Sequence, residues 1–319
     1  MGCKSWAQLS NHPRRCPMSL VINHNMMAAN TARNLNAHYS QLSKSTERLS
    51  TGLRVNSAAD DAAGLAIREL QRADIATLHQ GARNANDAIS LIQTGDGALG
   101  VIDEKLTRMK ELAEQAATGT YDSTQRLMIE SEYQAMASEI TRIANATDFN
   151  GIKLLDGTLS SSSHDGSGLT ATGKLKVHFG TGNDSAEDYY YITIGSCTAS
   201  ALGVGNQAIN PDTGQLRAGG TISTQEAAQQ SLVALTDAIV SKDKIRAHLG
   251  AMQNRLENTI TNLNTQAENL QSAESRISDV DVATEMTQFV RTQILSQSAV
   301  AMLSQANSLP QMAMQLIGG

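Results

Sequence analysis

The feature that most constrains this chain is a long heptad pattern of apolar residues. Between residues 75 and 116, apolar side chains recur at alternating spacings of three and four, and only Asp96 interrupts them. This spacing predicts an apolar stripe along a helix and is typical of coiled coils. A continuous helix over 58–117 would be about 90 Å long at ~1.5 Å per residue, far longer than a compact domain needs. The stripe comprises Ile75, Leu78, Ala82, Ala85, Ile89, Ile92, Leu99, Ile102, Leu106, Met109, Ala113 and Ala116.

A second heptad pattern predicts another long helix near the C-terminal end. Ser223 and Glu226 have the spacing of a capping box at its start. Between the two long patterns, Asp122 and Gln125 predict the start of a shorter helix that folds back antiparallel. The second stripe comprises Leu235, Ile239, Ile245, Leu249, Met252, Leu256, Ile260, Leu263, Ala267, Leu270 and Ile277.

Amphipathic helices are also predicted at both ends of the chain. The first begins near Ser19 and ends at Gly52, and Ser57 with Asp60 predicts a capping box for the next helix. The last begins at 278–281, and Pro310 should bend or weaken its final turns. The first seam consists of Leu35, Tyr39, Leu42, Thr46 and Leu49, and the last helix contains Met286, Phe289, Val290, Ile294, Val300, Leu303 and Leu316.

The middle of the chain predicts a small amount of β-structure. Asn150-Gly151 is a turn signal before a short extended piece at 152–155. Apolar and polar residues alternate over 174–179, and strand formers recur at 189–194, so a hairpin is the simplest prediction. The Ser- and Gly-rich segment 160–168 is predicted to be a solvated loop.

Composition excludes several functional classes. The net charge of −6 and the lack of a basic stripe disfavour nucleic acid and anionic membranes as partners. No apolar run reaches the roughly 18 residues that span a bilayer, and neither Met1 nor Met18 precedes a Sec-type signal. No nucleophile motif is present, so we expect no catalytic residue, no cofactor and no enzymatic activity.

Two motifs invite a ligand interpretation that the sequence does not support. Cys3, His12 and Cys16 are too few for a closed tetrahedral metal site, and Cys197 is the only other cysteine, so we expect no metal and no disulfide framework. The string Gly-Asp-Gly-Ala-Leu-Gly at 95–100 matches a dinucleotide-binding pattern, but no strand precedes it. Asp60 and Asp61 are predicted to lie at a helix N-terminus.

These patterns predict a mainly α fold: long antiparallel coiled-coil helices with a small β-containing central region. One terminal segment of about 40 residues has too few large apolar side chains to offset its ordering entropy. We therefore expect it to fold with neighbouring copies, and a head-to-tail interface that does not close generates a helical filament.

The residues at 49–67, Leu-Ser-Thr-Gly-Leu-Arg-Val-Asn-Ser-Ala-Ala-Asp-Asp-Ala-Ala-Gly-Leu-Ala-Ile, and the run Asn-Ala-Asn-Asp-Ala-Ile-Ser-Leu-Ile-Gln-Thr-Gly-Asp-Gly-Ala-Leu at 84–99 closely resemble bacterial flagellin. The resemblance extends over most of 18–317 except the middle. Because it begins at Met18, we expect Met18 to be the natural start. It implies a flagellin-like fold that follows an extension at 1–17. This extension has no helical periodicity, and we expect it to be disordered. The implied parts of the fold are an inner-core terminal helix domain from 18–56 and 278–319, a coiled-coil rod from 57–157 and 223–277, and a hairpin and loop region of the rod at 158–222.

The resemblance further implies a secreted subunit that is exported unfolded and polymerises outside the cell into the flagellar filament. Its implied partners are further copies of itself, an export chaperone, the filament cap and hook-associated proteins. The residues predicted to pack between subunits are Leu35, Leu42, Leu49, Ile89, Ile92, Leu99, Leu256, Leu263, Leu270, Phe289 and Leu303.

Enteric flagellins are also recognised by Toll-like receptor 5. The run Leu-Thr-Arg-Met-Lys-Glu-Leu at 106–112 and Ile-Glu-Ser-Glu at 129–132 resemble the recognised region, which implies contacts by Arg108, Leu112 and Glu132. Ala135 departs from the pattern, because enteric flagellins have Gln there. The alternative role of Arg108 and Glu132 is subunit packing or simple solvent exposure.

Two other functions stay open at this point. A hook-filament junction protein shares the terminal helices, and a soluble coiled-coil adaptor would explain the heptads. The adaptor would not need aggregation-prone helices at both ends, and the close match over 49–99 favours flagellin over the junction protein.

Overall fold

A computed structural model describes residues 24–166, 172–185, 187–206 and 219–317. It divides into two compact units. Unit 1 combines 1–68 with 275–319, and unit 2 consists of 69–274. The predicted extension at 1–17, the start at Met18 and part of the loop at 160–168 lie outside the described residues.

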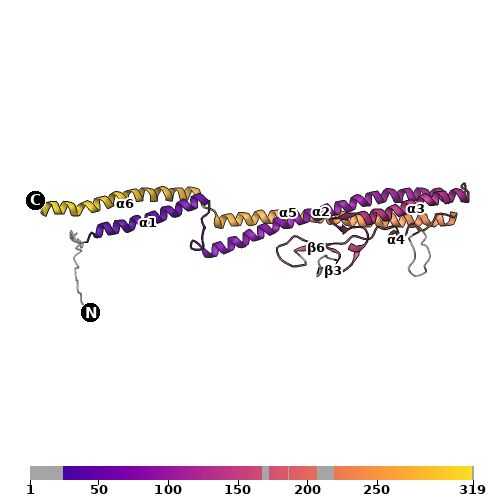
Figure 1. Ribbon diagram of the computed structural model, residues 1–319, viewed down its shortest axis with the longest axis horizontal. Coiled ribbons are helices and arrows are strands. Elements are labelled where there is room, and N and C mark those ends of the chain that lie inside the picture. Colours follow the sequence, from indigo (N-terminus) through magenta and orange to yellow (C-terminus); the bar gives the residue numbers. More distant parts are fainter. Residues whose placement is uncertain (1–23, 167–171, 186, 207–218, 318–319) are drawn as a thin grey trace, which may run out of the picture. The chain divides into compact units, whose positions relative to one another are not determined.

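Unit 1 is built from two long helices, α1 (Met26–Thr51) and α6 (Val282–Ile317), which lie side by side (Figure 1). The carboxamide oxygen of Asn25 accepts a hydrogen bond from the backbone N–H of Ala28 and caps α1. Gly52 ends α1 as predicted: its φ is 74°, and its N–H bonds to the carbonyl of Arg48 at 2.9 Å. α6 continues through Pro310 to Ile317.

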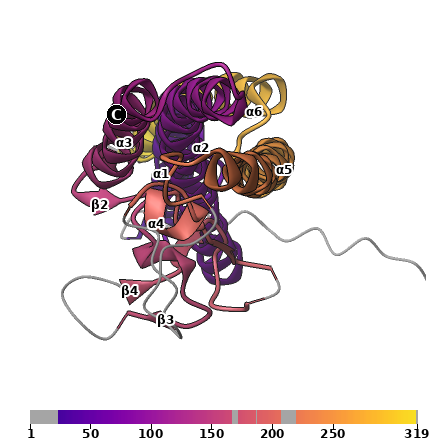
Figure 2. The same ribbon diagram turned by 90° about the vertical axis from the view of Figure 1, so that its right-hand side faces the viewer.

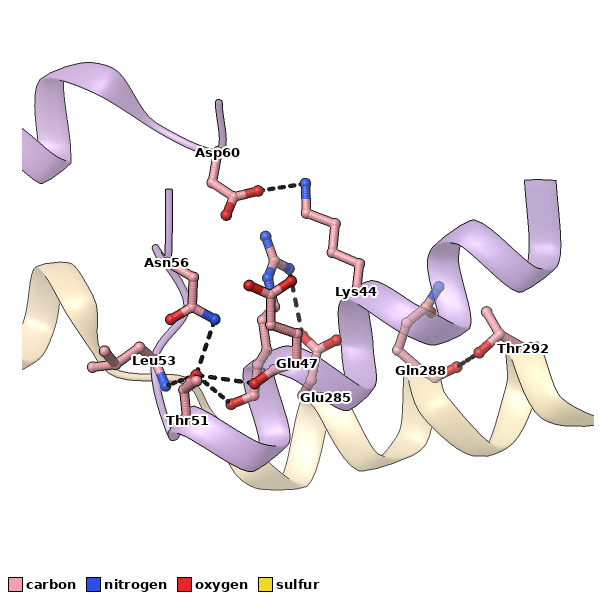
Figure 3. A network of polar contacts seen from close by, with 10 residues as sticks. Lys44, Glu47, Thr51, Leu53, Asn56, Asp60, Glu285, Gln288 and Thr292 are labelled. Carbon is pink, nitrogen blue, oxygen red and sulfur yellow. Dashed lines mark hydrogen bonds and ion pairs between the residues drawn. The ribbon is translucent and has the colours of Figure 1, made fainter. Parts of the chain in front are cut away.

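The segments that follow α1 and precede α6 meet in unit 1. Leu53 and Asp279 form an antiparallel bridge, and the N–H of Val280 bonds to the carbonyl of Gly52 at 3.0 Å. Figure 3 shows the polar contacts around this turn, where the ammonium of Lys44 lies 2.5 Å from the carboxylate of Asp60. These contacts fix the two chain segments against each other at one end of the α1·α6 pair.

Unit 2 contains most of the two long helices predicted from the heptads. These are α2 (Ala62–Ala117) and α5 (Gln225–Ser278), and they pack with the fold-back helix α3 (Ser123–Ala146). The string at 95–100 lies inside α2, so its context is not that of a dinucleotide-binding loop. The predicted α3 cap is confirmed, because the side chain of Gln125 accepts from the N–H of Asp122 at 3.1 Å.

Two predicted caps were wrong by one or more residues. Asp61, rather than Ser57, caps α2 by accepting from the N–H of Gly64 at 2.9 Å, while Asp60 pairs with Lys44. Thr224, rather than Ser223, accepts from the N–H of Ala227 at 3.2 Å at the start of α5. In both places several neighbouring side chains could act as the cap, and the path of the preceding loop selects one.

The strands of unit 2 form antiparallel pairs on one side of its helices (Figure 2). The β1–β2 turn is the predicted one, since Asn150 and Gly151 have φ values of 50° and 81°. The predicted hairpin is also confirmed, with Leu175 opposite Ile192 and His178 opposite Tyr189. The elements are β1 (Asp148–Phe149), β2 (Ile152–Lys153), η1 (Thr158–Ser160), β3 (His164–Asp165), β4 (Thr172–Gly173), β5 (Leu175–His178), β6 (Tyr189–Ile192) and α4 (Ala199–Leu202).

The β5–β6 hairpin docks on α2 by a close backbone approach. The side chain of Asn84 donates to the carbonyl of His178 at 2.9 Å, and Phe179 is buried among Leu78 and Leu263. A Cβ atom at Gly81 would collide with the carbonyl of Phe179. Glycine at this helical position therefore allows the hairpin to reach the helix surface.

Candidate assembly surface

The most deeply buried residues of the interface between α1 and α6 are small or polar. Ser45 on α1 is buried, as are Thr292, Ser296 and Ala306 on α6. The hydroxyls of Thr292 and Ser296 are satisfied within α6, donating to the carbonyls of Gln288 and Thr292 at 2.9 and 2.8 Å. Small side chains let two helices approach closely but bury little apolar area.

Large apolar side chains of α6 lie on the outside of this pair. Val282, Met286, Val290 and Ile294 follow one another at spacings of four, and their exposed fractions are 58%, 44%, 46% and 56%. An i±4 row of this kind forms a ridge that can pack into the groove of another helix. Further large apolar side chains of unit 1 are exposed: Met26, Met27, Tyr39, Leu295, Val300, Met302, Met312 and Met314.

The α1·α6 pair therefore leaves more large apolar surface exposed than a self-sufficient helical hairpin would. Fully burying a Val, Ile or Met side chain is worth about 1.5–3 kcal/mol, so covering the exposed half of each ridge residue would contribute about 1 kcal/mol. A contiguous exposed apolar surface marks an interaction site. α1 and α6 are helical within one chain, but a row of large apolar side chains on α6 stays about half exposed there.

A shallow hollow of about 340 Å³ lies between α1 and α6. Tyr39 and Leu42 line it from α1, and Gln293, Ser296, Gln297 and Val300 line it from α6. Its lining combines apolar side chains with carboxamide and hydroxyl groups. It therefore offers both an apolar contact and hydrogen-bonding groups to an incoming side chain.

The predicted packing residues of the terminal helices lie in the α1·α6 interface. Leu35, Leu42, Leu49, Phe289 and Leu303 are half-buried there. Two other predicted seam residues were placed wrongly, because Tyr39 is 51% exposed and Thr46 is exposed as well. The actual stripe on α1 replaces them with His38 and Ser45, which keep the heptad spacing to the three leucines.

The predicted packing residues of the rod are used within the chain. Ile92, Leu99 and Leu256 are at most 1% exposed, and Leu263 is 8% exposed. Ile89 and Leu270 are half-buried against the same helices. These six residues belong to the core of unit 2 or pack against it, so their packing between subunits stays an untested prediction.

Arg108 and Glu132 come together on the surface of unit 2. The guanidinium of Arg108 on α2 bonds to the carboxylate of Glu132 on α3 at 2.8 and 3.0 Å, and to Glu111 at 2.9 Å. The bonds to Glu132 and then Glu111 raise the pKa of Arg108. Leu112, the third residue of the predicted receptor contact, does not reach the surface. It is 1% exposed and packs in the core, because it lies on the inward-facing stripe of α2.

Metal ligands and membrane-spanning helices were also considered within the described part of the chain. It contains no group of three or more His, Cys, Asp or Glu side chains that could hold a metal ion. Its helices include none long and apolar enough to cross a membrane. Cys3, His12 and Cys16, at which no metal site was expected, lie outside the described residues.

Comparison with known proteins accounts for both ends of the chain. The bacterial flagellin N-terminal helical region matches residues 22–160, and the bacterial flagellin C-terminal helical region matches 232–317. A flagellin of Halalkalibacterium halodurans is 42% identical over 93% of this chain and 100% of its own length. The chain belongs to the bacterial flagellin family. This flagellin is therefore a structural subunit of a flagellar filament.

Other relatives agree with this assignment. The flagellin of Bacillus subtilis is 41% identical over 93% of this flagellin and 99% of its own length. A solved structure of a putative flagellar hook-associated protein from Vibrio parahaemolyticus has a TM-score of 0.52 at 15% identity, covering 69% of this flagellin and 100% of that chain. The latter likeness concerns the fold alone, so the comparisons favour flagellin over the junction protein.

Proposed function

We propose that this flagellin is exported unfolded and polymerises outside the cell through unit 1. The observation that supports this proposal is the row of large apolar side chains on α6 that its contact with α1 leaves exposed. Neighbouring copies cover the ridge Val282, Met286, Val290 and Ile294. We infer a structural rather than a catalytic role, and the terminal helices reach full stability only in the polymer.

The hollow between α1 and α6 is the complementary feature in this proposal. A ridge residue of one copy enters the hollow lined by Tyr39, Leu42 and Val300 of the next copy. The contacting surfaces are different parts of unit 1, so the interface is heterologous and can continue into a filament.

Seeded polymerisation of the purified protein tests this proposal. We would compare the natural chain with the double variant Val290→Gln and Ile294→Gln, measuring pelletable polymer and far-UV circular dichroism on the same samples. The natural chain should form sedimenting filaments with a rise in helicity. The double variant should stay in the supernatant, because glutamine removes apolar contact area while keeping good helix propensity.

Thr287→Gln is the matched control, since it places glutamine at an exposed polar position of the same helix. It should polymerise like the natural chain. Normal polymerisation of the ridge double variant would refute the role of the ridge. A natural chain with maximal helicity that never sediments would instead support the soluble coiled-coil adaptor.

Secretion and the accessory partners belong to the same proposal. The family membership supports export through the flagellar apparatus, with an export chaperone, a filament cap and hook-associated proteins as partners. Detection of the chain in sheared extracellular filaments, and its retention in the cell when flagellar export is blocked, would test the route. Equal release without flagellar export would contradict it.

The exposed Arg108–Glu132 pair supports a second proposed role, recognition by Toll-like receptor 5. The two side chains are 48% and 44% exposed, so the pair contributes little to stability and can be altered without unfolding. Arg108→Ala should reduce receptor signalling in a reporter assay with an unchanged melting temperature. Arg142→Ala is the control, because Arg142 forms a similar exposed pair with Glu139. Equal signalling by both variants would refute the role of Arg108.

A further inference from the structure

One face of the β5–β6 hairpin carries a compact array of cationic and aromatic side chains. Alternation along the strand places Lys174, Lys176 and His178 on the same side. The opposite strand places Tyr189 and Tyr191 beside them, with Lys176 opposite Tyr191 and His178 opposite Tyr189. We name these five residues the lysine–tyrosine face.

The two tyrosine rings hold the two ammonium groups in defined positions. The ammonium of Lys176 lies 3.7 Å from the ring centre of Tyr189, and that of Lys174 lies 4.1 Å from the ring centre of Tyr191. The two rings meet edge to face with centres 5.3 Å apart. These contacts reduce the entropy that the flexible lysine side chains would lose on binding a ligand.

The charges of the two ammonium groups are the next feature of this face. Among the described residues, neither Lys174 nor Lys176 forms an ion pair with a carboxylate. A ring face attracts a cation but does not neutralise it, so both ammonium groups keep their charge for an external anion.

The lysine–tyrosine face is also not needed to attach the hairpin. The opposite side of the hairpin does this, through buried Val177 and Ile192. Phe179 at the end of β5 packs against the ring of Tyr190, with centres 4.6 Å apart, and the guanidinium of Arg255 lies 3.5 Å from the same ring. The two faces therefore have separate roles, and the lysine–tyrosine face is unassigned.

We propose that the lysine–tyrosine face binds an acidic polysaccharide whose sugars carry carboxylate groups. Side chains two apart on one strand are separated by about 6.7 Å, so the two lysines form a two-point site for carboxylates on a polymer. The tyrosine rings add apolar surface beside the ammonium groups that can contact the C–H groups of the sugars. A neutral polysaccharide gains no ion pair there, and a small inorganic anion cannot bridge both lysines with the same strength.

Binding of polygalacturonate to the unseeded, full-length monomer tests this proposal. Titration at low salt should show saturable binding that weakens as salt is raised, since the contacts lie at the surface. The double variant Lys174→Gln and Lys176→Gln should bind at least about tenfold more weakly. Tyr189→Leu with Tyr191→Leu should also weaken binding, because the lysines lose the rings that position them.

The matched control is the double variant Lys153→Gln and Lys244→Gln, which removes two exposed lysines elsewhere in unit 2. It should bind polygalacturonate within about twofold of the natural chain, and no variant should bind neutral dextran. Equal losses in the two lysine double variants would show nonspecific attraction and overturn the proposal. Inorganic sulfate that competes at the same charge concentration as the polymer would also overturn it.

The role of the face in assembly provides a separate outcome. If the Lys174→Gln and Lys176→Gln variant binds polygalacturonate normally but no longer polymerises, the lysine–tyrosine face is a subunit contact and the proposal fails. If it polymerises normally and loses the polysaccharide, the proposal stands independently of the assembly surface on unit 1. Near-ultraviolet circular dichroism of the tyrosines checks that the hairpin is retained.

Discussion

The ammonium group of Lys242 on α5 lies 2.5 Å from the carboxylate of Asp103 on α2, although Lys242 itself is only 1% exposed. Lys242 occupies a core position of the heptad pattern, seven residues after Leu235 and seven before Leu249. A second carboxylate, that of Asp243, lies 2.7 Å away. Burial alone would lower the pKa of Lys242, but the hydrogen bonds and charges of Asp103 and Asp243 raise it.

This arrangement predicts unequal effects for the two partners. Asp103→Ala should destabilise unit 2 by about 1–3 kcal/mol, because it removes a hydrogen-bonded partner from a buried ammonium. Lys242→Met should be neutral or stabilising, because it puts an apolar side chain in the core and leaves Asp103 half-exposed to water. Chemical denaturation measures both. The control is Glu104→Ala, at an exposed neighbouring position, which should change stability by less than about 0.5 kcal/mol. A larger loss of stability from Lys242→Met than from Asp103→Ala would contradict the prediction.

The close approach at Gly81 predicts opposite effects for two glycine substitutions in α2. Gly81→Ala should displace the β5–β6 hairpin, at a cost of about 1–3 kcal/mol, because the new methyl group collides with the backbone of Phe179. Gly97→Ala meets nothing within 4 Å and should stabilise the helix by about 0.5–1 kcal/mol. Thermal unfolding and tyrosine near-ultraviolet circular dichroism distinguish the two. A stabilising Gly81→Ala would mean that the hairpin does not dock there.

Two carboxylates of unit 1 predict a loss of helicity in acid. The hydrogen bond from Lys44 lowers the pKa of Asp60, and hydrogen bonds from Thr284 and Ala283 lower that of Asp281 at the start of α6. Because the folded-state pKa values lie below the unfolded value of ~3.9, these groups stabilise the fold above that pH and stop doing so as the pH falls through their folded values.

Acid titration followed by far-UV circular dichroism measures this effect. The double variant Asp60→Asn and Asp281→Asn should be less stable than the natural chain at neutral pH, because it lacks both carboxylates. It should therefore show a smaller loss of helicity than the natural chain when the pH falls below about 4. Asp237→Asn, at an exposed position of α5, should leave the titration unchanged. The same acid curve for all three proteins would show that neither carboxylate contributes.

The buried thiol of Cys197 predicts slow chemical modification. Its exposed fraction is 0%, and burial raises its pKa to about 11, an effect that the charge of Lys242 partly opposes. At pH 8 the folded protein should therefore present little thiolate at this position. Peptide mapping after iodoacetamide treatment should show slow labelling of Cys197 in the folded chain and rapid labelling in denaturant. Equal rates would indicate that the region around α4 opens readily.

Local signals in the sequence predicted the elements of this fold well. The heptad stripes gave the two long helices, because a side chain's position on a helix follows directly from its spacing. Gly52, Asp122 and Asn150-Gly151 marked ends and turns correctly, since their side chains or backbone preferences act over only a few residues. The caps at Ser57 and Ser223 were wrong because the loop path, which is not local, chose a different side chain.

Which face of each helix is buried was decided only by the tertiary structure. On α6, apolar residues occur on all sides, so periodicity could not distinguish the interface with α1 from the exposed ridge at Met286, Val290 and Ile294. The heptad spacing places Lys242 on the core stripe of α5, but it could not reveal that this charged side chain stays buried there, because its burial depends on Asp103, 139 residues away. The sequence alone thus determined the helices and their turns. Packing between distant segments decided which side chains each unit buries and which it leaves for a partner, because burial depends on what another segment covers.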